Sequence, residues 1–224
     1  MKIGILGCRG IPNHYGGFEQ FAMHLATGLM QKGHTVTVYN SHNHPYREKE
    51  WKGIPLRHRF DPEYLMGTAG QFVYDLLCIL DSRSQGFDII LQLGYTSSAL
   101  WFPLHPGGPQ IITCMDGLEW KRSKYNFLTR KFLRWSERQA VNQSHALVAD
   151  SGAIGRYIGE KYKMQPEYIA YGAEIFTRPD PLVVRLRGLE PWRYGLVIAR
   201  MQPDNHTEEI IQGFLEGRTD FPLV

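Results

Sequence analysis

The chain has 224 residues, of which 43% are hydrophobic and 21% are charged, and its formal net charge at pH 7 is +3. This composition is ordinary for a globular protein, and the charge is too small to require a nucleic acid or another polyanion as partner. No apolar run reaches the roughly 18 residues that cross a bilayer, and the run before Arg9 is too short for a signal peptide, so we expect a cytoplasmic protein.

Short apolar runs alternate with segments of helical periodicity along most of the chain. A strand is predicted over Met1–Leu6, and a helix begins at Phe18 and ends at Gly33. Further strands are expected at 35–39, 54–57, 87–93, 110–114, 145–149 and 168–171, and further helices at 71–80, from 94–98 onward with Thr96 or Ser97 as N-cap, and from 150–151 to about 161. This alternation predicts an α/β fold with a doubly wound parallel sheet.

Four loops follow predicted strands and hold the polar and glycine residues of interest: 7–17, 94–98, 116–119 and 150–151. Ligands of doubly wound sheets bind at the carboxyl ends of the strands. We therefore expect these loops to meet at one site.

The prolines at 179, 181 and 191 interrupt the periodic pattern. We expect a first domain over 1–176, a linker over 177–192, and the beginning of a second, truncated α/β domain over 193–224, with strands at 194–199 and 221–224 and a helix at 208–215. About thirty residues cannot bury a core alone, so this part is expected to be a fragment or to lean on the first domain.

The three cysteines have no paired spacing, which favours buried free thiols over a disulfide or zinc site. His42 and His44 stand beside Pro45 in a polar stretch that reads as a loop, with no third ligand nearby in sequence. We expect no metal site.

A glycine-rich loop containing Gly7, Gly10, Gly16 and Gly17 joins the first strand to the first helix. Its spacing differs from the dinucleotide fingerprint, and no Walker-type G-K-[ST] follows. Glycines let a ligand approach the backbone, and free N–H groups at a helix start face an anion. Two interpretations stay open: a phosphate site, or a plain turn between strand and helix.

Residues 7–20, Gly-Cys-Arg-Gly-Ile-Pro-Asn-His-Tyr-Gly-Gly-Phe-Glu-Gln, resemble the opening loop of retaining family 4 glycosyltransferases of the GT-B fold. The likeness is greatest to a branch described as rhamnosyltransferases of bacterial polysaccharide biosynthesis. It implies that this chain is the N-terminal, acceptor-side Rossmann-like half of such an enzyme. It also implies that Gly16 and Gly17 approach the donor diphosphate.

Residues 113–122, Thr-Cys-Met-Asp-Gly-Leu-Glu-Trp-Lys-Arg, are similar to a second motif of this branch. The resemblance implies that Asp116 faces the sugar cleft and binds or deprotonates an acceptor hydroxyl as the catalytic carboxylate. The alternative is that Asp116 only begins an Asx-type turn with Gly117. The acceptor-side cleft is expected to include Tyr15, Tyr95, Ser97 and Glu119.

The run from Ile198 to Asn205 resembles the turn that opens the donor-binding domain of the family. The resemblance implies that Arg200 pairs with the donor diphosphate, for which a guanidinium has suitable geometry. Asn205 stands where many relatives carry a lysine, so this position contributes no positive charge. The alternative is that Arg200 is a strand-end residue on a surface turn.

Residues 121–138 carry seven basic side chains and one acid, Glu137, interleaved with aromatic and aliphatic residues. Such a segment can dock on an anionic membrane, pack on the sheet as a plain surface helix, or bind nucleic acid phosphates. The small net charge disfavours nucleic acid. The docking candidates are Lys121, Arg122, Lys124, Arg130, Lys131 and Arg134.

The intact protein is therefore expected to be a retaining glycosyltransferase that moves a sugar, rhamnose in the resembled branch, from a nucleoside diphosphate sugar to a glycan or lipid-linked acceptor. No cofactor or metal is expected, since the chain has no D-x-D motif. The E-x7-E element of the family is absent, so the chain alone is expected to be inactive. Alternatives are a nucleotide-sugar epimerase of the same superfamily and a non-catalytic domain that binds glycan or membrane. The expected location is the cytoplasm, at the inner face of the membrane if 121–138 docks.

Overall fold

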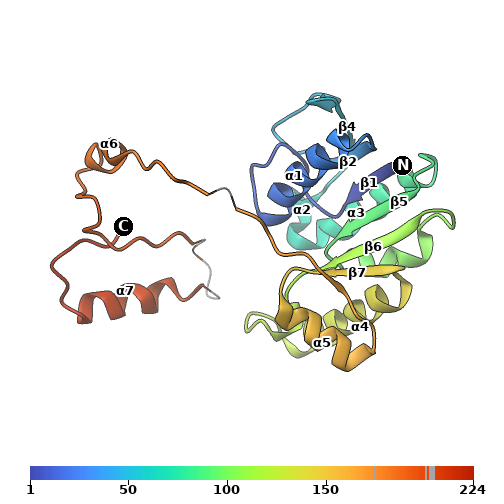
Figure 1. Ribbon diagram of the computed structural model, residues 1–224. Coiled ribbons are helices and arrows are strands. Elements are labelled where there is room, and N and C mark those ends of the chain that lie inside the picture. The colour runs from blue at the N-terminus through green and yellow to red at the C-terminus, as the bar shows by residue number, and fades with distance from the viewer. Residues whose placement is uncertain (174, 200, 202–204) are drawn as a thin grey trace. The chain divides into compact units, whose positions relative to one another are not determined.

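The computed structural model describes residues 1–173, 175–199, 201 and 205–224 (Figure 1). The chain separates into two compact units. The first comprises residues 1–121 and 127–171, and the second comprises residues 122–126 and 172–224. The predicted boundaries at 176 and 192 stay predictions.

An eight-stranded sheet forms the centre of the first unit, in the order β3-β4-β2-β1-β5-β6-β7-β8. Every neighbouring pair is parallel except β3–β4. The strands are β1 (Lys2–Leu6), β2 (Thr35–Ser41), β3 (Glu50–Trp51), β4 (Ile54–Arg59), β5 (Ile89–Leu93), β6 (Gln110–Met115), β7 (Ala146–Ala149) and β8 (Glu167–Tyr168). The strand order reverses between β1 and β5, which creates the crevice where doubly wound sheets bind ligands. The predicted fold class is confirmed.

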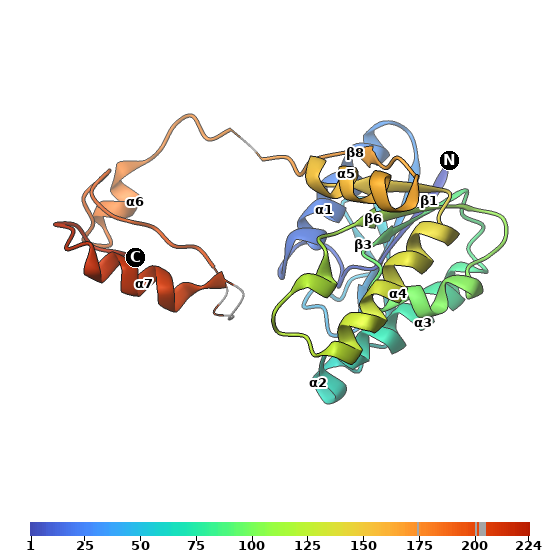
Figure 2. The same cartoon turned by 90° about the horizontal axis from the view of Figure 1, so that it is seen from below.

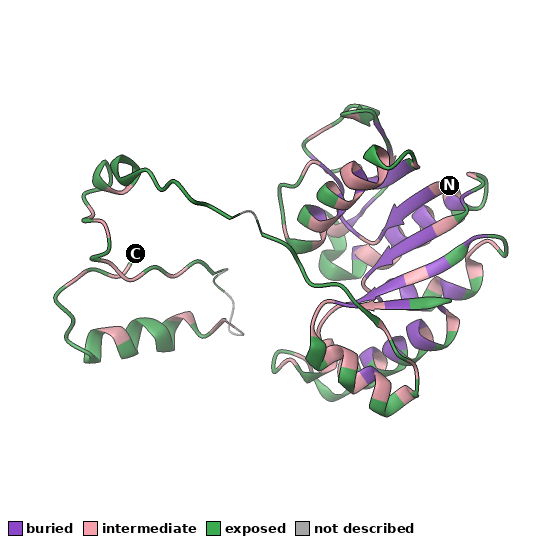
Figure 3. Cartoon of the chain, viewed as in Figure 1, coloured by how far each residue is buried: buried purple, intermediate pink, exposed green. Residues whose placement is uncertain are grey.

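Helices cover both faces of the sheet (Figure 2). The helical elements of this unit are α1 (Gly17–Gln31), α2 (Glu63–Met66), η1 (Gly67–Ala69), α3 (Gly70–Ser82), η2 (Ser98–Leu104), η3 (Glu119–Lys121), α4 (Phe127–Gln143) and α5 (Gly152–Tyr162). Side chains alternate along β1, so Ile5 packs on the α1 side and Leu6 on the side of α3 and α4. Figure 3 shows the buried residues concentrated along the central strands and the helix faces over them.

The segment after β5 differs from its prediction. A regular helix capped by Thr96 or Ser97 was expected, whereas residues 98–104 form a 3₁₀ helix that contains Pro103. Ser97 makes no cap, because its Oγ donates a 2.6 Å hydrogen bond to Asp75 Oδ2 on α3. The Ser97 hydroxyl therefore bonds a side chain of another helix instead of capping its own.

The described residues of the second unit form the helices α6 (Pro181–Arg185) and α7 (Thr207–Glu216). The strands expected at 194–199 and 221–224 are reduced to a single parallel bridge between Gly195 and Leu223, which corrects the prediction. An isolated pair of strands is marginal in water. No described residue between 175 and 224 is buried.

Within the described ranges, none of the helices has the length and hydropathy that a bilayer-spanning segment requires.

Candidate functional site

The glycine-rich loop leaves the carboxyl end of β1 and leads into α1, at the crevice where the strand order reverses. Two of its glycines are required by the fold. Gly7 has φ +86°, and a Cβ there would lie 2.3 Å from the Leu93 carbonyl oxygen. Gly10 has φ +122°, and a Cβ there would lie 2.3 Å from Asn40 Cγ. Residues other than glycine rarely adopt these backbone angles, so the fold itself requires glycine at both positions.

Asn40, at the end of β2, fixes the middle of the loop. Its Oδ1 accepts from the Ile11 N–H at 3.1 Å, and its Nδ2 donates to the Ile11 carbonyl at 2.8 Å. On the other side of the loop, the buried Glu19 accepts from the Arg9 N–H at 2.7 Å. The loop is therefore held before any ligand binds.

Gly16 and Gly17 have no comparable structural reason. A Cβ on Gly17 would have no atom within 4 Å, and a Cβ on Gly16 would meet only the flexible end of Glu19 at 3.2 Å. No side chain caps the start of α1. The first N–H groups of a helix lack intrahelical partners, and they carry a partial positive charge suited to an anion. The open backbone at Gly16 and Gly17 is compatible with the predicted phosphate contact.

Asp116 and Asp150 follow the neighbouring strands β6 and β7 and line one narrow hollow beneath α1. The Asp116 carboxylate accepts from the N–H of the next residue, Gly117, at 2.8 Å. An Asx turn would instead bond the N–H two residues on, so the alternative interpretation stays a prediction. Burial raises the pKa of Asp150, and the negative charge of Asp116 raises it further. The hollow of about 20 Å³ also contains Phe18, Phe21, Cys114, Met115, Val148, Ile169 and Tyr171.

Tyr171 closes the same hollow, with its ring 5.8 Å from that of Phe21. Its pKa is raised by burial and then by the charges of Asp116 and Asp150, so the phenol stays protonated. Sequence reasoning placed Asp150 at a strand end without assigning it a role, and it did not identify Tyr171. The parallel register, which brings the ends of β6 and β7 together, is the signal that pairs the two carboxylates.

The four predicted acceptor-side residues are not equivalent. Tyr15 is exposed, and the Arg9 guanidinium lies 4.0 Å from the centre of its ring. Tyr95 and Ser97 are buried, and Tyr95 donates to the Gly117 carbonyl at 3.3 Å. Tyr95 thus supports the Asp116 loop from inside the domain, whereas Ser97 bonds Asp75 on α3, and in this conformation neither is open to an acceptor. Glu119 begins η3 and is half-buried.

Glu137 of α4 anchors the loop that carries Asp116. It is fully buried, and its two oxygens accept from four donors: Trp120 Nε1 at 2.9 Å, Tyr157 Oη at 2.9 Å, Tyr162 Oη at 2.6 Å and Lys161 Nζ at 2.7 Å. Burial and the Glu137 hydrogen bond raise the pKa of Tyr162 to about 12. This one acid of the basic segment therefore joins η3, α4 and α5.

The basic segment has a buried face and an exposed face. Leu133, Ser136 and Val141 are among the residues of α4 that pack inward. Phe127 and Leu128 at the helix start are 77% and 73% exposed. Of the docking candidates, Lys121, Lys124, Lys131 and Arg134 are exposed, and Arg122 and Arg130 are half-buried.

The two residues predicted from the donor-domain motif fall in the second unit. Arg200 lies outside the described residues. Asn205 is described, is half-buried, and precedes α7. Their predicted contact with a diphosphate stays a prediction.

Cysteine and metal chemistry find no support in the part of the chain that the structure describes. Cys8, Cys78 and Cys114 are free and buried, as predicted. Burial raises the pKa of Cys8 and of Cys114 to about 12, with added effects of nearby carboxylates, so both thiols stay protonated. The described residues contain no group of three or more His, Cys, Asp or Glu side chains arranged to hold a metal ion.

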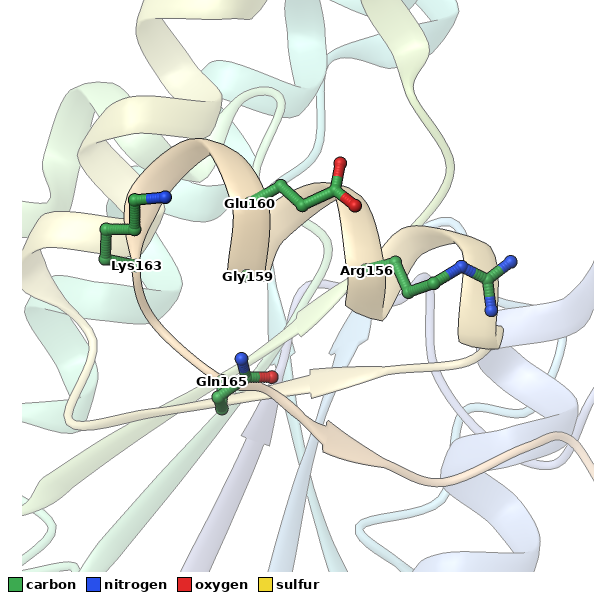
Figure 4. Close-up of a pocket in the computed structure, with 5 residues that line it drawn as sticks. All are labelled: Arg156, Gly159, Glu160, Lys163 and Gln165. Carbon is green, nitrogen blue, oxygen red and sulfur yellow. The ribbon is translucent and has the colours of Figure 1, made fainter.

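Two further hollows lie on the first unit. One, of about 240 Å³, is lined by Arg9, His14, Ser41, Asn43, His44, Asp61, Glu63 and Tyr64, and we call it the Asp61 pocket. The other, of about 480 Å³, is lined by Arg156, Gly159, Glu160, Lys163 and Gln165, on and just after α5 (Figure 4). None of the five residues of this α5 hollow is buried.

Comparison with known proteins gives a family and a fold. Residues 1–174 match the family described as "Domain of unknown function (DUF1972)". A sucrose-phosphate synthase from Thermosynechococcus elongatus has a similar structure, with a TM-score of 0.80 and 12% identity over 99% of this chain. At that identity the likeness shows a shared fold and no more. The chain spans 61% of the length of that structure.

An alpha-glucosyltransferase in complex with UDP and a 13-mer DNA is more distant, with a TM-score of 0.49 and 11% identity over 96% of this chain and 52% of that one. A TM-score of 0.49 does not establish that the two proteins share a fold. No curated protein matches the chain.

Proposed function

We propose that the intact protein, which belongs to the family described as a domain of unknown function (DUF1972), is a glycosyltransferase, because it shares the fold of a sucrose-phosphate synthase and carries the motifs at residues 7–20 and 113–122. Its donor is a nucleoside diphosphate sugar, and its acceptor is a glycan or a lipid-linked glycan. The motifs at residues 7–20 and 113–122 favour the retaining family 4 branch and a rhamnosyl donor.

The observation that carries this proposal is the open start of α1. Gly7 and Gly10 are glycines because the fold leaves no room for a side chain, whereas Gly17 has empty space around it. A glycine within a helix costs about 1 kcal/mol relative to alanine. A ligand that lies against the backbone would explain why residues 16 and 17 are glycines, which the packing of the protein does not. The uncapped N–H groups at the start of α1 suit a diphosphate.

In the proposed reaction, an acceptor hydroxyl oxygen bonds to the anomeric carbon while the bond from that carbon to the diphosphate breaks. The hydroxyl proton passes to the departing diphosphate on the same face, which retains the configuration. The start of α1 stabilises the charge that develops on the diphosphate, as does Arg200 in its predicted role. Asp116 binds the acceptor hydroxyl, and no metal takes part.

Asp150 supplies a second carboxyl group beside Asp116. Burial and the negative charge of Asp116 raise the pKa of Asp150 in the hollow that both residues line. We assign Asp150 the role of a hydrogen-bonding partner for a sugar hydroxyl at this end of the site.

A lipid-linked acceptor lies in a membrane, so the proposal includes peripheral contact with an anionic membrane. Phe127 and Leu128 project from the start of α4 beside the exposed cations Lys131 and Arg134. Apolar side chains that enter a bilayer, next to cations that meet lipid head groups, are the features of an interfacial helix.

Nucleoside diphosphate release by the intact protein tests the proposal. We expect one nucleotide sugar of a panel to be consumed only when a glycan acceptor is present, with the product anomer retained. Asp116→Asn should lower kcat and leave donor affinity nearly unchanged. Acceptor-independent epimerisation of the sugar would support the epimerase instead, and binding of a glycan without turnover of any donor would leave a non-catalytic module.

A further inference from the structure

The Asp61 pocket is built from three segments that are distant in sequence. Arg9 and His14 come from the glycine-rich loop, Ser41 ends β2 and His44 follows it, and Asp61 follows β4. All three segments stand at carboxyl ends of neighbouring strands, on the same side of the sheet as Gly16 and Gly17. The pocket therefore shares Arg9 and His14 with the glycine-rich loop, and its lining does not include Gly16 or Gly17.

The walls of the pocket are fixed by hydrogen bonds. Asp61 is buried, its N–H donates to His42 Nδ1 at 2.8 Å, and its carbonyl accepts from Asn43 Nδ2 at 2.8 Å. Its carboxylate Oδ1 accepts from the Glu63 N–H at 3.0 Å. Such a framework holds the carboxylate in one orientation before a ligand arrives.

His44 secures the opposite wall. It is buried, its Nδ1 accepts from the Tyr46 N–H at 3.1 Å, and its Nε2 lies 3.1 Å from the Pro12 carbonyl. With Nδ1 as acceptor, the Nε2–H donates to Pro12, which is the arrangement of a neutral imidazole. Burial lowers the pKa of His44, which is consistent with that neutral form. The His14 ring stands edge-on to His44 at 4.4 Å.

The charges in the pocket disfavour an anion. The Arg9 guanidinium is already paired with Glu63 through two hydrogen bonds of 2.6 and 2.9 Å, and it lies over the Tyr15 ring. One guanidinium faces two carboxylates, so the pocket has a negative net charge. A metal ion is disfavoured because no three suitable side chains converge within the described residues.

One acceptor atom remains for a ligand. Within the described part of the chain, Asp61 Oδ2 makes no hydrogen bond and is not among the fully buried polar atoms that lack a partner, so it keeps some exposure on a residue that lines the pocket. A carboxylate oxygen accepts hydroxyl groups well. The exposed ring of Tyr64 offers an apolar surface at the mouth of the pocket.

We propose that the Asp61 pocket binds one neutral, hydroxyl-rich ring, a pyranose unit of the acceptor, with Asp61 Oδ2 accepting from its hydroxyl groups and Tyr64 covering one face. The volume of about 240 Å³ suits a single such ring rather than an extended chain. This inference rests on the proposed glycosyltransferase function, for which it names the place where a sugar ring of the acceptor binds.

The test is saturation-transfer NMR on the 224-residue chain with a panel of methyl glycopyranosides. We expect saturation of the ring protons of at least one glycoside, reduced at least five-fold in Asp61→Asn, which keeps an oxygen for the Glu63 N–H. Tyr64→Ala should reduce it also, and because Tyr64 is exposed, this second variant separates a lost contact from a lost fold. The matched control is Glu160→Gln in the α5 hollow, which should leave the signal unchanged.

Equal saturation in the wild type, Asp61→Asn and Tyr64→Ala would overturn the inference, as would the absence of transfer to every glycoside. Displacement of the glycoside by inorganic pyrophosphate, in the wild type and Gly17→Ala alike, would also overturn it, because the pocket would then be an anion site. Donor binding is measured separately through Gly17. Glycoside binding without donor binding would therefore preserve this inference and remove the proposed function. Donor binding without glycoside binding would preserve the proposed function and remove this inference.

Discussion

The glycines of the glycine-rich loop have two different explanations. The positive φ of Gly7 and the contact distance to the Leu93 carbonyl explain that glycine entirely from the fold. Gly17 has neither a positive φ nor a neighbour within 4 Å. The same residue type therefore marks packing at one position and, in our proposal, a bound diphosphate at the other.

Asp75 is predicted to make the protein less stable as the pH rises from about 4 to about 7. Burial raises the pKa of Asp75 from 3.8 to about 7, although the Ser97 hydrogen bond opposes this. In that window the unfolded chain has released the proton and the folded protein has kept it, so stability falls by up to ~1.4 kcal/mol per pH unit. Urea unfolding of Asp75→Asn should show a flatter dependence. An unchanged slope would remove Asp75 as the cause.

At the scale of elements, Asp81 ties α3 to two strands. It accepts from Tyr39 of β2 at 2.8 Å, from Arg57 of β4 at 2.5 and 2.8 Å, and from Arg59. Burial alone would raise the pKa of Asp81, but these hydrogen bonds outweigh it and lower the pKa to about 2.

This cluster predicts a loss of stability in acid. The contribution of Asp81 is fully present above its unfolded pKa near 3.8 and is lost as the pH falls through about 2. Asp81→Asn should lower the free energy of unfolding at pH 7 by about 2 kcal/mol and weaken the acid dependence below pH 4, measured by urea unfolding. Glu167→Gln, an exposed edge position, serves as control. A variant as stable as the wild type at pH 7 would contradict the prediction.

Glu137 is predicted to position the loop that carries Asp116. Glu137→Gln should destabilise the protein by about 2–4 kcal/mol, because an amide cannot satisfy the Lys161 ammonium and the three other donors together. The Trp120 indole N–H should change its NMR chemical shift, since it donates directly to this carboxylate. Arg138→Gln, the exposed next residue, should change neither quantity. A Trp120 resonance that stays in place in Glu137→Gln would refute the anchoring role.

At the scale of the whole molecule, the start of α4 is predicted to bind anionic bilayers. The double substitution Phe127→Ser and Leu128→Ser should reduce co-sedimentation with phosphatidylglycerol vesicles several-fold, because it removes the two exposed apolar side chains that enter the bilayer. Reversing the charge of Lys131 and Arg134 should also weaken binding and reduce its salt dependence. Tyr168→Ser with Ile169→Ser, at another exposed site, is the control. Equal sedimentation of all variants would identify α4 as a plain surface helix.

The sequence predicts those parts of the molecule whose signals are local. Residues 2–31 read correctly because an apolar strand, several glycines and a helical period follow one another. Ser97 was misassigned as a cap because its partner, Asp75, comes from a different helix. The Asp61 pocket could not be predicted, since its residues come from three loops that look merely polar in sequence.

The proposed opening at Gly17 for the donor diphosphate is tested by one pair of measurements on Gly17→Ala in the intact protein. Thermal unfolding should show a fold as stable as the wild type or up to about 1 kcal/mol more stable, because alanine meets no atom and favours the helix. Calorimetric titration with nucleoside diphosphates should show at least a ten-fold loss of affinity for the nucleotide that the wild type binds. Unchanged affinity in a stable variant would contradict the claim, and the glycines at the start of α1 would then be a plain turn.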